Sequence, residues 1–429
     1  MDTNPTRVGI IGCGNISGIY LKNAQRFEGI TVAACADLDL ARAQAKAAEF
    51  GVPRACTVEE LLADPTIELV VNLTIPRAHA SVGQAVLAAR KSLYTEKPLT
   101  LTREEGRALL EQARERSLRV GGAPDTFLGA GWQTGRKLID EGAIGVPVAA
   151  IAHMLCHGHE GWHPDPAFYY QPGGGPLFDM GPYYLTALVS LLGPVHYVNG
   201  MARASFPERT ITSLPRRGER ITVAVPTHTA AVLQFASGAI ATLVTSFDVW
   251  KSDAPRLEIH GSEGSLSLPD PNGFDGAVRL HRAGEAGWSD IPLIPGYRGN
   301  SRGIGVADLA EAIRDGRPPR ASGDLAYHVL DVMQAIHETA ADGPRRTIES
   351  TCERPAPLVG GSAEVQEEGD LAPRSATSVP RENTTADHAE RIKRAREDGQ
   401  AGRAVTVTRE ELERIAAVPD DEMARTIEQ

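Results

Sequence analysis

The 429-residue sequence has few cysteines and no long apolar run, and each shortage excludes a class of protein. Its five cysteines are odd in number and scattered, with no Cys-x-x-Cys pair, so neither a disulfide framework nor a zinc knuckle is supported. No stretch of about 18 apolar residues exists, and no basic segment followed by an apolar one opens the chain. The sequence therefore predicts no membrane span and no secretory signal, with the cytoplasm as the expected location.

The sequence also contains fewer basic than acidic residues, 44 against 55. The formal net charge is −11, and nucleic acid is not an expected partner because phosphate binding requires a basic face. Residues 361–429 hold 16 acidic and 10 basic residues and lack Phe, Tyr and Trp. Such a segment buries little, so we expect residues 351–429 to form an acidic, disordered tail. A capping box opens residues 408–417, which we interpret as a short, frayed amphipathic helix rather than a docked one.

The most informative positive feature is an apolar strand near the N-terminus that runs into glycines and then into an apolar-periodic helix. Gly12 supplies a tight turn, and Gly14, which has no β-carbon, lets the backbone approach a phosphate. The helix begins near Asn15 and Ile16, where free N–H groups meet the charge of a pyrophosphate. We assign these four residues to a dinucleotide site; a glycine turn that serves packing alone is the alternative.

A carboxylate follows at the distance that a dinucleotide site requires. A second predicted strand, residues 30–36, ends at Asp37, about 20 residues beyond the glycines. An aspartate there accepts hydrogen bonds from the two hydroxyls of the adenosine ribose and repels a 2′-phosphate. Asp37 therefore favours NAD over NADP as the cofactor, unless it is an ordinary surface aspartate that opens a turn.

Alternating strand and helix signals follow. Capping boxes at Thr57 and Thr102 each precede a helical stretch, and residues 69–73 and 92–96 are apolar runs suited to buried parallel strands. This βαβ pattern predicts an α/β domain over residues 1–125, with the doubly wound parallel sheet of a Rossmann fold.

The pattern then changes to longer β-rich runs. Residues 230–235 and 239–247 are joined across Ser237-Gly238, which predicts a tight hairpin. Predicted helices follow at residues 305–315 and 325–340. These signals predict an α+β domain over residues 126–350, whose mostly antiparallel sheet is covered by helices on one face. A substrate cleft is expected where this domain meets the first.

Two clusters of side chains are candidates for chemistry in that cleft. Lys97 follows a first-domain strand, and it can take a hydroxyl proton if burial and a nearby nicotinamide lower its pKa. Asp179 and Tyr183 lie four residues apart after a glycine run, so they share a helix face. Asp179 can hold a sugar hydroxyl, and Tyr183 can pass a proton to a carbonyl or alkoxide oxygen. A solvent lysine, a helix-cap aspartate and a core tyrosine are the alternatives.

The segment from residue 153 to residue 164 is rich in histidine. Four of its side chains suggest a metal site: His157, His159, Glu160 and His163. Their spacing does not match a zinc site, so no metal is predicted. We expect Trp162 to stack on a sugar ring and His163 to bind a hydroxyl, while the other residues order the loop. Lys251 and Arg302 are further candidates for contacts to an anionic substrate.

Taken together, these motifs resemble the glucose–fructose oxidoreductase, inositol dehydrogenase and MocA-like family (Gfo/Idh/MocA). The resemblance spans residues 6–345, and its remaining signatures are Thr74-Ile75-Pro76, His79, Glu96-Lys97-Pro98 and the late stretch Ala326-Tyr327-His328-Val329-Leu330-Asp331. It implies NAD(P)-dependent hydride transfer between nicotinamide and a carbinol or carbonyl carbon of a sugar, a sugar derivative or a cyclitol. It also implies an open-faced, mixed, largely antiparallel second sheet, through which dimers or tetramers form.

The same resemblance implies individual roles. Lys97 is the catalytic lysine, the Lys97-Pro98 peptide is cis, and four residues join the cofactor site: Thr74, Pro76, His79 and Glu96. One departure concerns proton transfer, because many members place His four residues after the aspartate, where this chain has Tyr183. Relatives of the glucose–fructose oxidoreductase and dihydrodiol dehydrogenase types resemble this chain there. A tyrosine, whose ordinary pKa is about 10, suits donation to a carbonyl better than proton abstraction, so the direction of reaction stays open.

Two other functions stay open from the sequence. An NAD-dependent glycoside hydrolase oxidises its substrate, eliminates the aglycone and returns the hydride, and it uses the same lysine and tyrosine. A non-catalytic NAD-bound regulatory protein is the third hypothesis. The presence of Lys97, Asp179 and Tyr183 disfavours that one.

Overall fold

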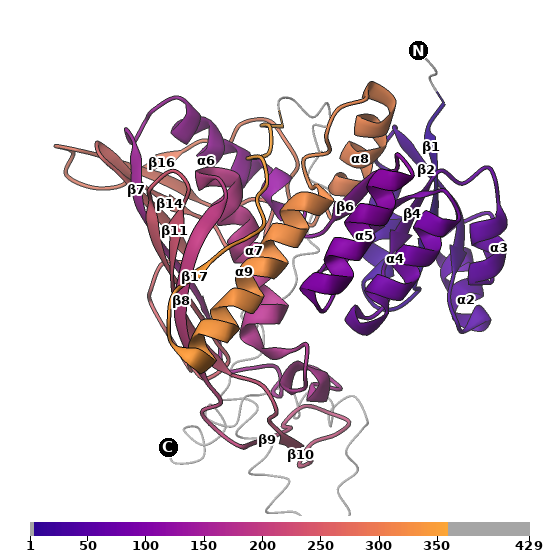
Figure 1. The fold of residues 1–429 in the computed structure, drawn as a ribbon, viewed down its shortest axis with the longest axis horizontal. Coiled ribbons are helices and arrows are strands. Elements are labelled where there is room, and N and C mark those ends of the chain that lie inside the picture. The colour runs from indigo at the N-terminus through magenta and orange to yellow at the C-terminus, as the bar shows by residue number, and fades with distance from the viewer. Residues whose placement is uncertain (1–3, 359–429) are drawn as a thin grey trace, which may run out of the picture. The chain divides into compact units, whose positions relative to one another are not determined.

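The computed structural model describes residues 4–358, in which a parallel sheet is followed by a mixed sheet (Figure 1). The first sheet has six parallel strands in the order β3-β2-β1-β4-β5-β6. Its strands are β1 (Thr6–Ile11), β2 (Ile30–Ala36), β3 (Ala55–Cys56), β4 (Leu69–Asn72), β5 (Ser92–Thr95) and β6 (Val120–Gly122). This is the predicted doubly wound order, with β1 and β4 side by side at the switch point.

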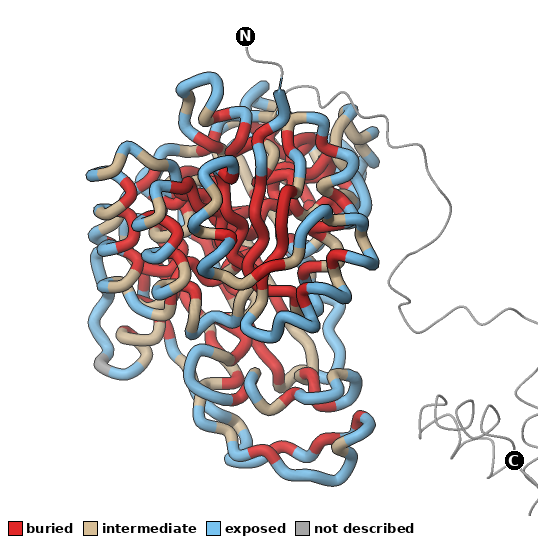
Figure 2. The backbone as a smooth tube through the Cα atoms, turned by 90° about the vertical axis from the view of Figure 1, so that its right-hand side faces the viewer, coloured by how far each residue is buried: buried red, intermediate tan, exposed pale blue. Residues whose placement is uncertain are grey.

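Helices cover this parallel sheet. They are α1 (Ser17–Ala24), α2 (Leu40–Phe50), α3 (Val58–Ala63), α4 (His79–Ala88) and α5 (Arg103–Glu115), with the short 3₁₀ helix η1 (Pro76–Ala78). Both predicted capping boxes are confirmed, at the starts of α3 and α5. Because helices lie over the strands, β4 and β5 are buried at every residue. In Figure 2 this part of the chain faces the viewer, and the buried residues gather along the central strands.

The second sheet has nine strands in the order β16-β15-β14-β13-β7-β12-β11-β8-β17. Its strands are β7 (Pro147–Leu155), β8 (Val195–Arg203), β11 (His228–Phe235), β12 (Ile240–Ser246), β13 (Leu257–Gly261), β14 (Gly264–Leu268), β15 (Val278–Arg282), β16 (Ser289–Ile291) and β17 (Arg346–Thr347). Strands β7 and β12 pair in parallel, and the other neighbours are antiparallel. The hairpin predicted across Ser237-Gly238 is confirmed as the β11–β12 pair. A separate small ribbon pairs β9 (Glu208–Thr210) with β10 (Arg220–Thr222).

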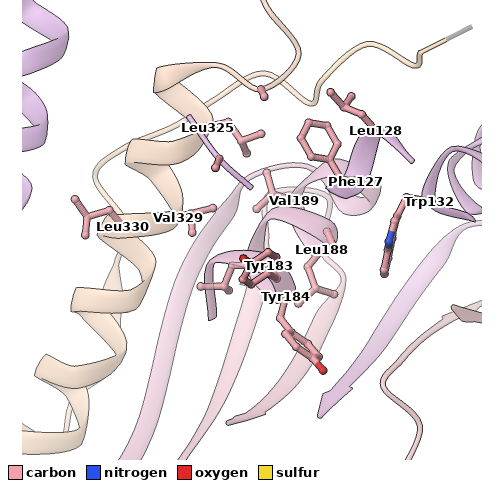
Figure 3. Close-up of a cluster of buried hydrophobic side chains, with 14 of the residues drawn as sticks. Phe127, Leu128, Trp132, Tyr183, Tyr184, Leu188, Val189, Leu325, Val329 and Leu330 are labelled. Carbon is pink, nitrogen blue, oxygen red and sulfur yellow. The ribbon is translucent and has the colours of Figure 1, made fainter. Parts of the chain in front are cut away.

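Helices pack on one face of the second sheet. They are α6 (Ala130–Asp140), α7 (Gly175–Leu192) and α9 (Gly323–Asp342), accompanied by η2 (Thr126–Leu128) and η3 (Ala167–Tyr170), whereas α8 (Ile304–Asp315) packs against β6 of the first sheet. Helix α7 lies against β7, β11 and β12, and α9 packs on α7, on β8 and on α5 of the first domain. Figure 3 shows the apolar side chains between these helices, among them Leu188, Val189 and Val329.

The opposite face of the second sheet is open. Burial alternates along β8 and β11, and the outward positions Met201 and Val232 are 81% and 49% exposed. This one-sided burial is the alternation expected of an antiparallel sheet with one uncovered face. No helix within residues 4–358 is long and apolar enough to cross a membrane.

The C-terminal end of the described chain is packed. Cys352 is buried, Arg136 Nη1 donates to Pro355 O at 2.7 Å, and Leu358 N donates to Gln133 Oε1 at 2.8 Å. The predicted tail boundary at residue 351 therefore lies within the packed part of the chain. The rest of the predicted tail, with the helix expected at residues 408–417, lies outside the described residues.

A buried histidine in α9 predicts acid sensitivity. His328 Nε2 accepts from Val195 N at 2.9 Å, and Nδ1 lies 3.0 Å from Ser350 Oγ. Burial lowers the pKa of His328 to about 4. Below pH 6.5 the unfolded chain binds a proton that the folded chain refuses, so the free energy of unfolding should fall by up to about 3 kcal/mol between pH 6.5 and 4. Urea unfolding across this range measures the loss.

The matched variant is His328→Gln, whose amide offers the same acceptor to Val195 and the same donor to Ser350. We expect it to flatten the pH dependence of the unfolding free energy over this window. An equally steep dependence in the variant would show that another group carries the effect.

Candidate active site

The turn after β1 requires a glycine. Gly12 has φ +101°, and a β-carbon there would lie 2.6 Å from the carbonyl carbon of Leu73. The backbone of β1 thus passes directly against the end of β4, at the carboxyl edge of the sheet. Only glycine combines this conformation with this approach.

The next glycine, Gly14, has free space on the side where a β-carbon would lie. A β-carbon at Gly14 would meet no protein atom within 4 Å, and Asn15 and Ile16 beside it are exposed. Helix α1 begins at Ser17 with no side chain capping its N-terminus and no acidic residue in its first turn. Free space beside uncapped N–H groups is the arrangement that a pyrophosphate needs, so this turn fits a dinucleotide.

Asp37 lies beside the same turn, at the end of β2. Its Oδ2 accepts from Cys13 N at 2.8 Å, and its Oδ1 accepts from Asp39 N at 2.9 Å. Arg42 Nη1 lies 3.5 Å from Oδ1. The carboxylate is therefore fixed next to the glycine turn, and Oδ2 keeps a lone pair for a ribose hydroxyl.

The loop after β4 is tied to the loop after β5. Asn72 Oδ1 accepts from Thr74 Oγ1 at 2.6 Å, and Pro76 begins η1. His79 is fully buried, with Nδ1 2.6 Å from Pro98 O and Nε2 3.0 Å from Thr74 O. Burial lowers the pKa of His79, and each ring nitrogen faces a backbone carbonyl oxygen. His79 thus joins two loops of the site instead of facing open space.

Glu96 connects the end of β5 to α1. Its Oε1 accepts from Tyr20 OH at 2.7 Å, and its Oε2 accepts from Lys97 N at 2.9 Å. The Lys97-Pro98 peptide is cis, as the resemblance implies. Tyr20 was not among the residues that sequence reasoning selected, although its place on the buried side of α1 is a usable signal.

Lys97 reaches across to α7. Its Nζ donates to Asp179 Oδ1 and to Asp179 O, both at 2.8 Å, and both side chains are mostly buried. Burial alone lowers the pKa of the Lys97 ammonium, but the Asp179 carboxylate outweighs it and raises that pKa above its usual value. The expectation of a lowered Lys97 pKa is therefore wrong here. Burial likewise opposes ionisation of Asp179, and the Lys97 ammonium overcomes it, holding the pKa of Asp179 well below its usual range.

Tyr183 completes this cluster one turn along α7. Lys97 Nζ lies 5.3 Å from the centroid of the Tyr183 ring, and Arg302 Cζ lies 6.0 Å from it. Figure 3 shows Tyr183 within the apolar cluster around α7, so its ring packs in the core beside the two cations. Asp179 is interior to α7, whose N-cap is Gly174, and so it is not a helix cap.

Asp179 has a second partner that sequence reasoning left as a loop residue. His159 Nε2 lies 3.2 Å from Asp179 Oδ2, and because a carboxylate only accepts, Nε2 carries the hydrogen. The imidazole is buried against Tyr169 and Phe247, with ring centroids 4.0 and 4.7 Å away. Lys97 and His159 therefore hold the two oxygens of one carboxylate, which fixes its orientation.

Trp162 and His163 lie on the outer side of His159. The Trp162 ring is 5.2 Å from His159 and 5.4 Å from His163, and its side chain is 64% exposed. Both predicted substrate residues thus lie next to the Asp179 cluster, at its solvent side. Glu160 points elsewhere, into a buried ion pair of 2.7 Å with Arg209. Within residues 4–358 no group of three or more His, Cys, Asp or Glu side chains is arranged to hold a metal.

Comparison with known proteins places both sheets in one family. Residues 6–122 match the oxidoreductase family with an NAD-binding Rossmann fold, Gfo/Idh/MocA, and residues 132–267 match the Gfo/Idh/MocA C-terminal domain. A 1,5-anhydro-D-fructose reductase of Ensifer adhaerens is 28% identical over 80% of this chain and 99% of its own length. An oxidoreductase of Rhizobium meliloti is 31% identical with the same coverage.

Solved structures share the fold. Levoglucosan dehydrogenase in complex with NADH superimposes with a TM-score of 0.70 at 21% identity, over 81% of this chain and all of that one. An NAD-binding oxidoreductase of Klebsiella pneumoniae gives a TM-score of 0.71 at 21% identity, over 80% of this chain and 99% of that one.

Proposed function

The chain belongs to the Gfo/Idh/MocA family of NAD-binding oxidoreductases, and from this membership we propose that it transfers a hydride between NAD and a carbinol or carbonyl carbon of a sugar, a sugar derivative or a cyclitol. The observation that carries the proposal is the junction of Lys97 with Asp179 and Tyr183 at the carboxyl edge of the parallel sheet. The names of the relatives, a reductase and dehydrogenases of sugars and inositol, support the substrate class.

The cofactor residues divide by what they contact. The glycine turn, with Gly12, Gly14, Asn15 and Ile16, would hold the pyrophosphate, and Asp37 the adenosine ribose. Thr74, Pro76, His79 and Glu96 would shape the nicotinamide end, with His79 acting through the two loops that it joins. When bound, the nicotinamide donates or accepts the hydride.

Lys97 and Tyr183 would handle the proton. The charged Lys97 Nζ donates a hydrogen bond to the substrate oxygen, and Asp179 keeps it charged. In carbonyl reduction the oxygen gains negative charge, which an ammonium and a phenol hydroxyl both stabilise. The ammonium form of Lys97 is the form that reduction requires, so we propose carbonyl reduction as the direction for which this site is prepared.

A substrate panel tests the proposal. The protein is mixed with NADH and a range of ketoses, anhydroketoses and inosose-type ketones, and with NAD⁺ and the matching alcohols, while the NADH absorbance is followed. Consumption or production of NADH with at least one member, absent in a Lys97→Met variant, is the expected result. No change across both panels, in a protein that binds NADH by fluorescence titration, would contradict the proposal.

Asp37 sets the preference for NAD in this proposal. We expect Asp37→Ser to weaken NADH binding about 10-fold, roughly 1.4 kcal/mol, because the ribose hydroxyls lose their acceptor. NADPH binding should improve, since Arg42, now 3.5 Å from the carboxylate and half-exposed, becomes free to pair with a 2′-phosphate. Fluorescence titration with both reduced cofactors measures the ratio of the two affinities.

The control for this switch is Asp37→Ser combined with Arg42→Ala, which should lose the gain in NADPH affinity. An unchanged NADH-to-NADPH ratio in Asp37→Ser would remove the role assigned to Asp37.

We further propose a homo-oligomer that buries the open face of the second sheet. Met201, Val232 and Ile240 share that face through the β8–β11–β12 register and are exposed. Such an apolar patch is typical of an interface. Met201→Lys with Val232→Lys should shift the mass in sedimentation toward the monomer, whereas an unchanged mass would contradict this interface.

We also propose a cytoplasmic location, where the five free cysteines stay reduced.

A further inference from the structure

A second positively charged side chain lies at the candidate site, and among residues 4–358 no carboxylate forms an ion pair with it. Arg302 lies in the loop before α8, with its guanidinium carbon 6.0 Å from the centroid of the Tyr183 ring and 5.9 Å from that of Phe274. Asn23 of α1 fixes this loop, since its Nδ2 donates to the carbonyl oxygens of residues 300 and 302 at 2.8 Å. Asn23, from a helix of the first domain, and the Phe274 ring, from the second domain, therefore hold the guanidinium against Tyr183.

The polar partners of the Arg302 guanidinium are neutral. Nη1 donates to Asn300 Oδ1 at 2.9 Å, and Nη2 donates to Asn272 Oδ1 at 2.5 Å and to Asn272 O at 3.4 Å. Among residues 4–358, no carboxylate oxygen lies within the 4.0 Å ion-pair distance of Arg302. Arg103 and Arg320, which are also mostly buried, each pair with a carboxylate at that distance. Burial of a charge without a counterion is costly, so a guanidinium kept this way suggests a ligand that supplies one.

The surrounding acids are engaged elsewhere. Asp125 acts on Arg302 from beyond ion-pair distance, but its Oδ2 accepts from the backbone N–H groups of Gly303 and Gly305 at 2.8 and 3.0 Å. Both oxygens of Glu96 are bound to Tyr20 and to the Lys97 amide. Asp179 serves Lys97 and His159.

We propose that Arg302 binds a carboxylate of the substrate, so that acidic sugars, such as uronic or ketoaldonic acids, are the preferred class. This inference rests on the proposed function and narrows its substrate. The guanidinium has five N–H groups: Nη1 and Nη2 each donate one to an asparagine, the Tyr183 side chain is a further partner, and the N–H groups that remain can bind a carboxylate. Because Arg302 adjoins the Tyr183 ring, a carboxylate bound there would place the sugar over the Lys97–Asp179–Tyr183 cluster.

The test compares substrates that differ in one group. Matched sets of a neutral sugar, its carboxylate and its phosphate ester are assayed by NADH absorbance with the wild type, Arg302→Met and Arg302→Lys. We expect the wild type to favour the carboxylate over the neutral partner by about 10-fold or more in kcat/KM. Arg302→Met should lose about 100-fold on the carboxylate and much less on the neutral sugar, and Arg302→Lys should restore part of the preference.

Controls separate this inference from the function on which it rests. Arg298→Met removes an exposed cation from the same loop and should leave the carboxylate preference unchanged. Equal losses on both members of a pair, or a wild-type preference for the neutral sugar, would overturn the inference while turnover upholds the proposed function. A preference for the phosphate ester would also overturn it. Silence with all three members, together with intact NADH binding, would count against the proposed function itself.

Discussion

Lys97→Met is expected to reduce kcat/KM by about 1,000-fold while the affinity for NADH stays within a few-fold of the wild type. The lysine is the cation that contacts Asp179 at 2.8 Å and faces Tyr183, so its loss removes the donor that the proposed function assigns to the substrate oxygen. Steady-state rates on the best substrate of the panel and fluorescence titration with NADH measure the two quantities. Turnover equal to that of the wild type would remove the catalytic role of Lys97.

The same substitution also affects stability, and a second variant separates the two effects. Without its ammonium partner, the mostly buried Asp179 carboxylate keeps only His159, which should cost about 3 kcal/mol of unfolding free energy. Lys97→Met with Asp179→Asn should recover much of that stability but none of the turnover. Lys137→Met, at an exposed lysine on α6, is the control and should change neither.

The Lys97–Asp179 ion pair stabilises the folded chain within a defined pH range. The pKa of Asp179 is lowered in the folded chain, so its contribution is present above the usual aspartate pKa of about 4 and is lost as pH falls below it. The pKa of Lys97 is raised, so its contribution is present below about pH 10 and is lost at higher pH. The pair is therefore intact throughout the neutral range in which the enzyme assays are run.

Elements whose signals lie close together in the sequence were predictable. The capping boxes at Thr57 and Thr102 place both partners within one turn, and the glycine turn after β1 is specified by adjacent residues. The apolar run that becomes β4 is buried on both faces, as a parallel strand between helices must be. In each case the determining interaction is local or depends on burial alone.

Contacts between distant segments were not predictable in the same way. His159 and Asp179 are 20 residues apart, and Tyr20 and Glu96 are 76 apart, so their pairing depends on how α7 and α1 pack. The pKa of Lys97 shows the consequence. Burial and a nicotinamide both lower it, but the Asp179 carboxylate, 82 residues away in the sequence, reverses the sign once the fold brings it within 2.8 Å.

Arg302 illustrates a different limit. The sequence names Arg302 together with Lys251 as a candidate for contacts to an anionic substrate, but it does not show which charges lie around either side chain. Only the folded structure shows that Arg302 has no carboxylate partner among residues 4–358. The amide oxygens of Asn272 and Asn300 accept its hydrogen bonds, whereas a carboxylate pairs with Arg103.

Gly14→Ala is the second substitution with a large expected effect, and it should act on the cofactor without affecting the fold. A β-carbon at Gly14 meets no protein atom within 4 Å, so the free energy of unfolding should stay within about 0.5 kcal/mol of the wild type. The added methyl group enters the space that a pyrophosphate requires above α1. We therefore expect NADH affinity to fall about 100-fold, roughly 3 kcal/mol, with turnover reduced in step at subsaturating cofactor.

Two further glycines make the comparison decisive. Gly12→Ala places its β-carbon 2.6 Å from the Leu73 backbone at φ +101°, so it should destabilise the fold by about 2 kcal/mol or more. Gly287→Ala also meets no protein atom within 4 Å, but it lies far along the chain in the second domain and should change neither stability nor affinity. Gly14→Ala with unchanged NADH affinity would mean that the space above α1 is not the pyrophosphate site, and the dinucleotide would have to bind against another edge of the sheet.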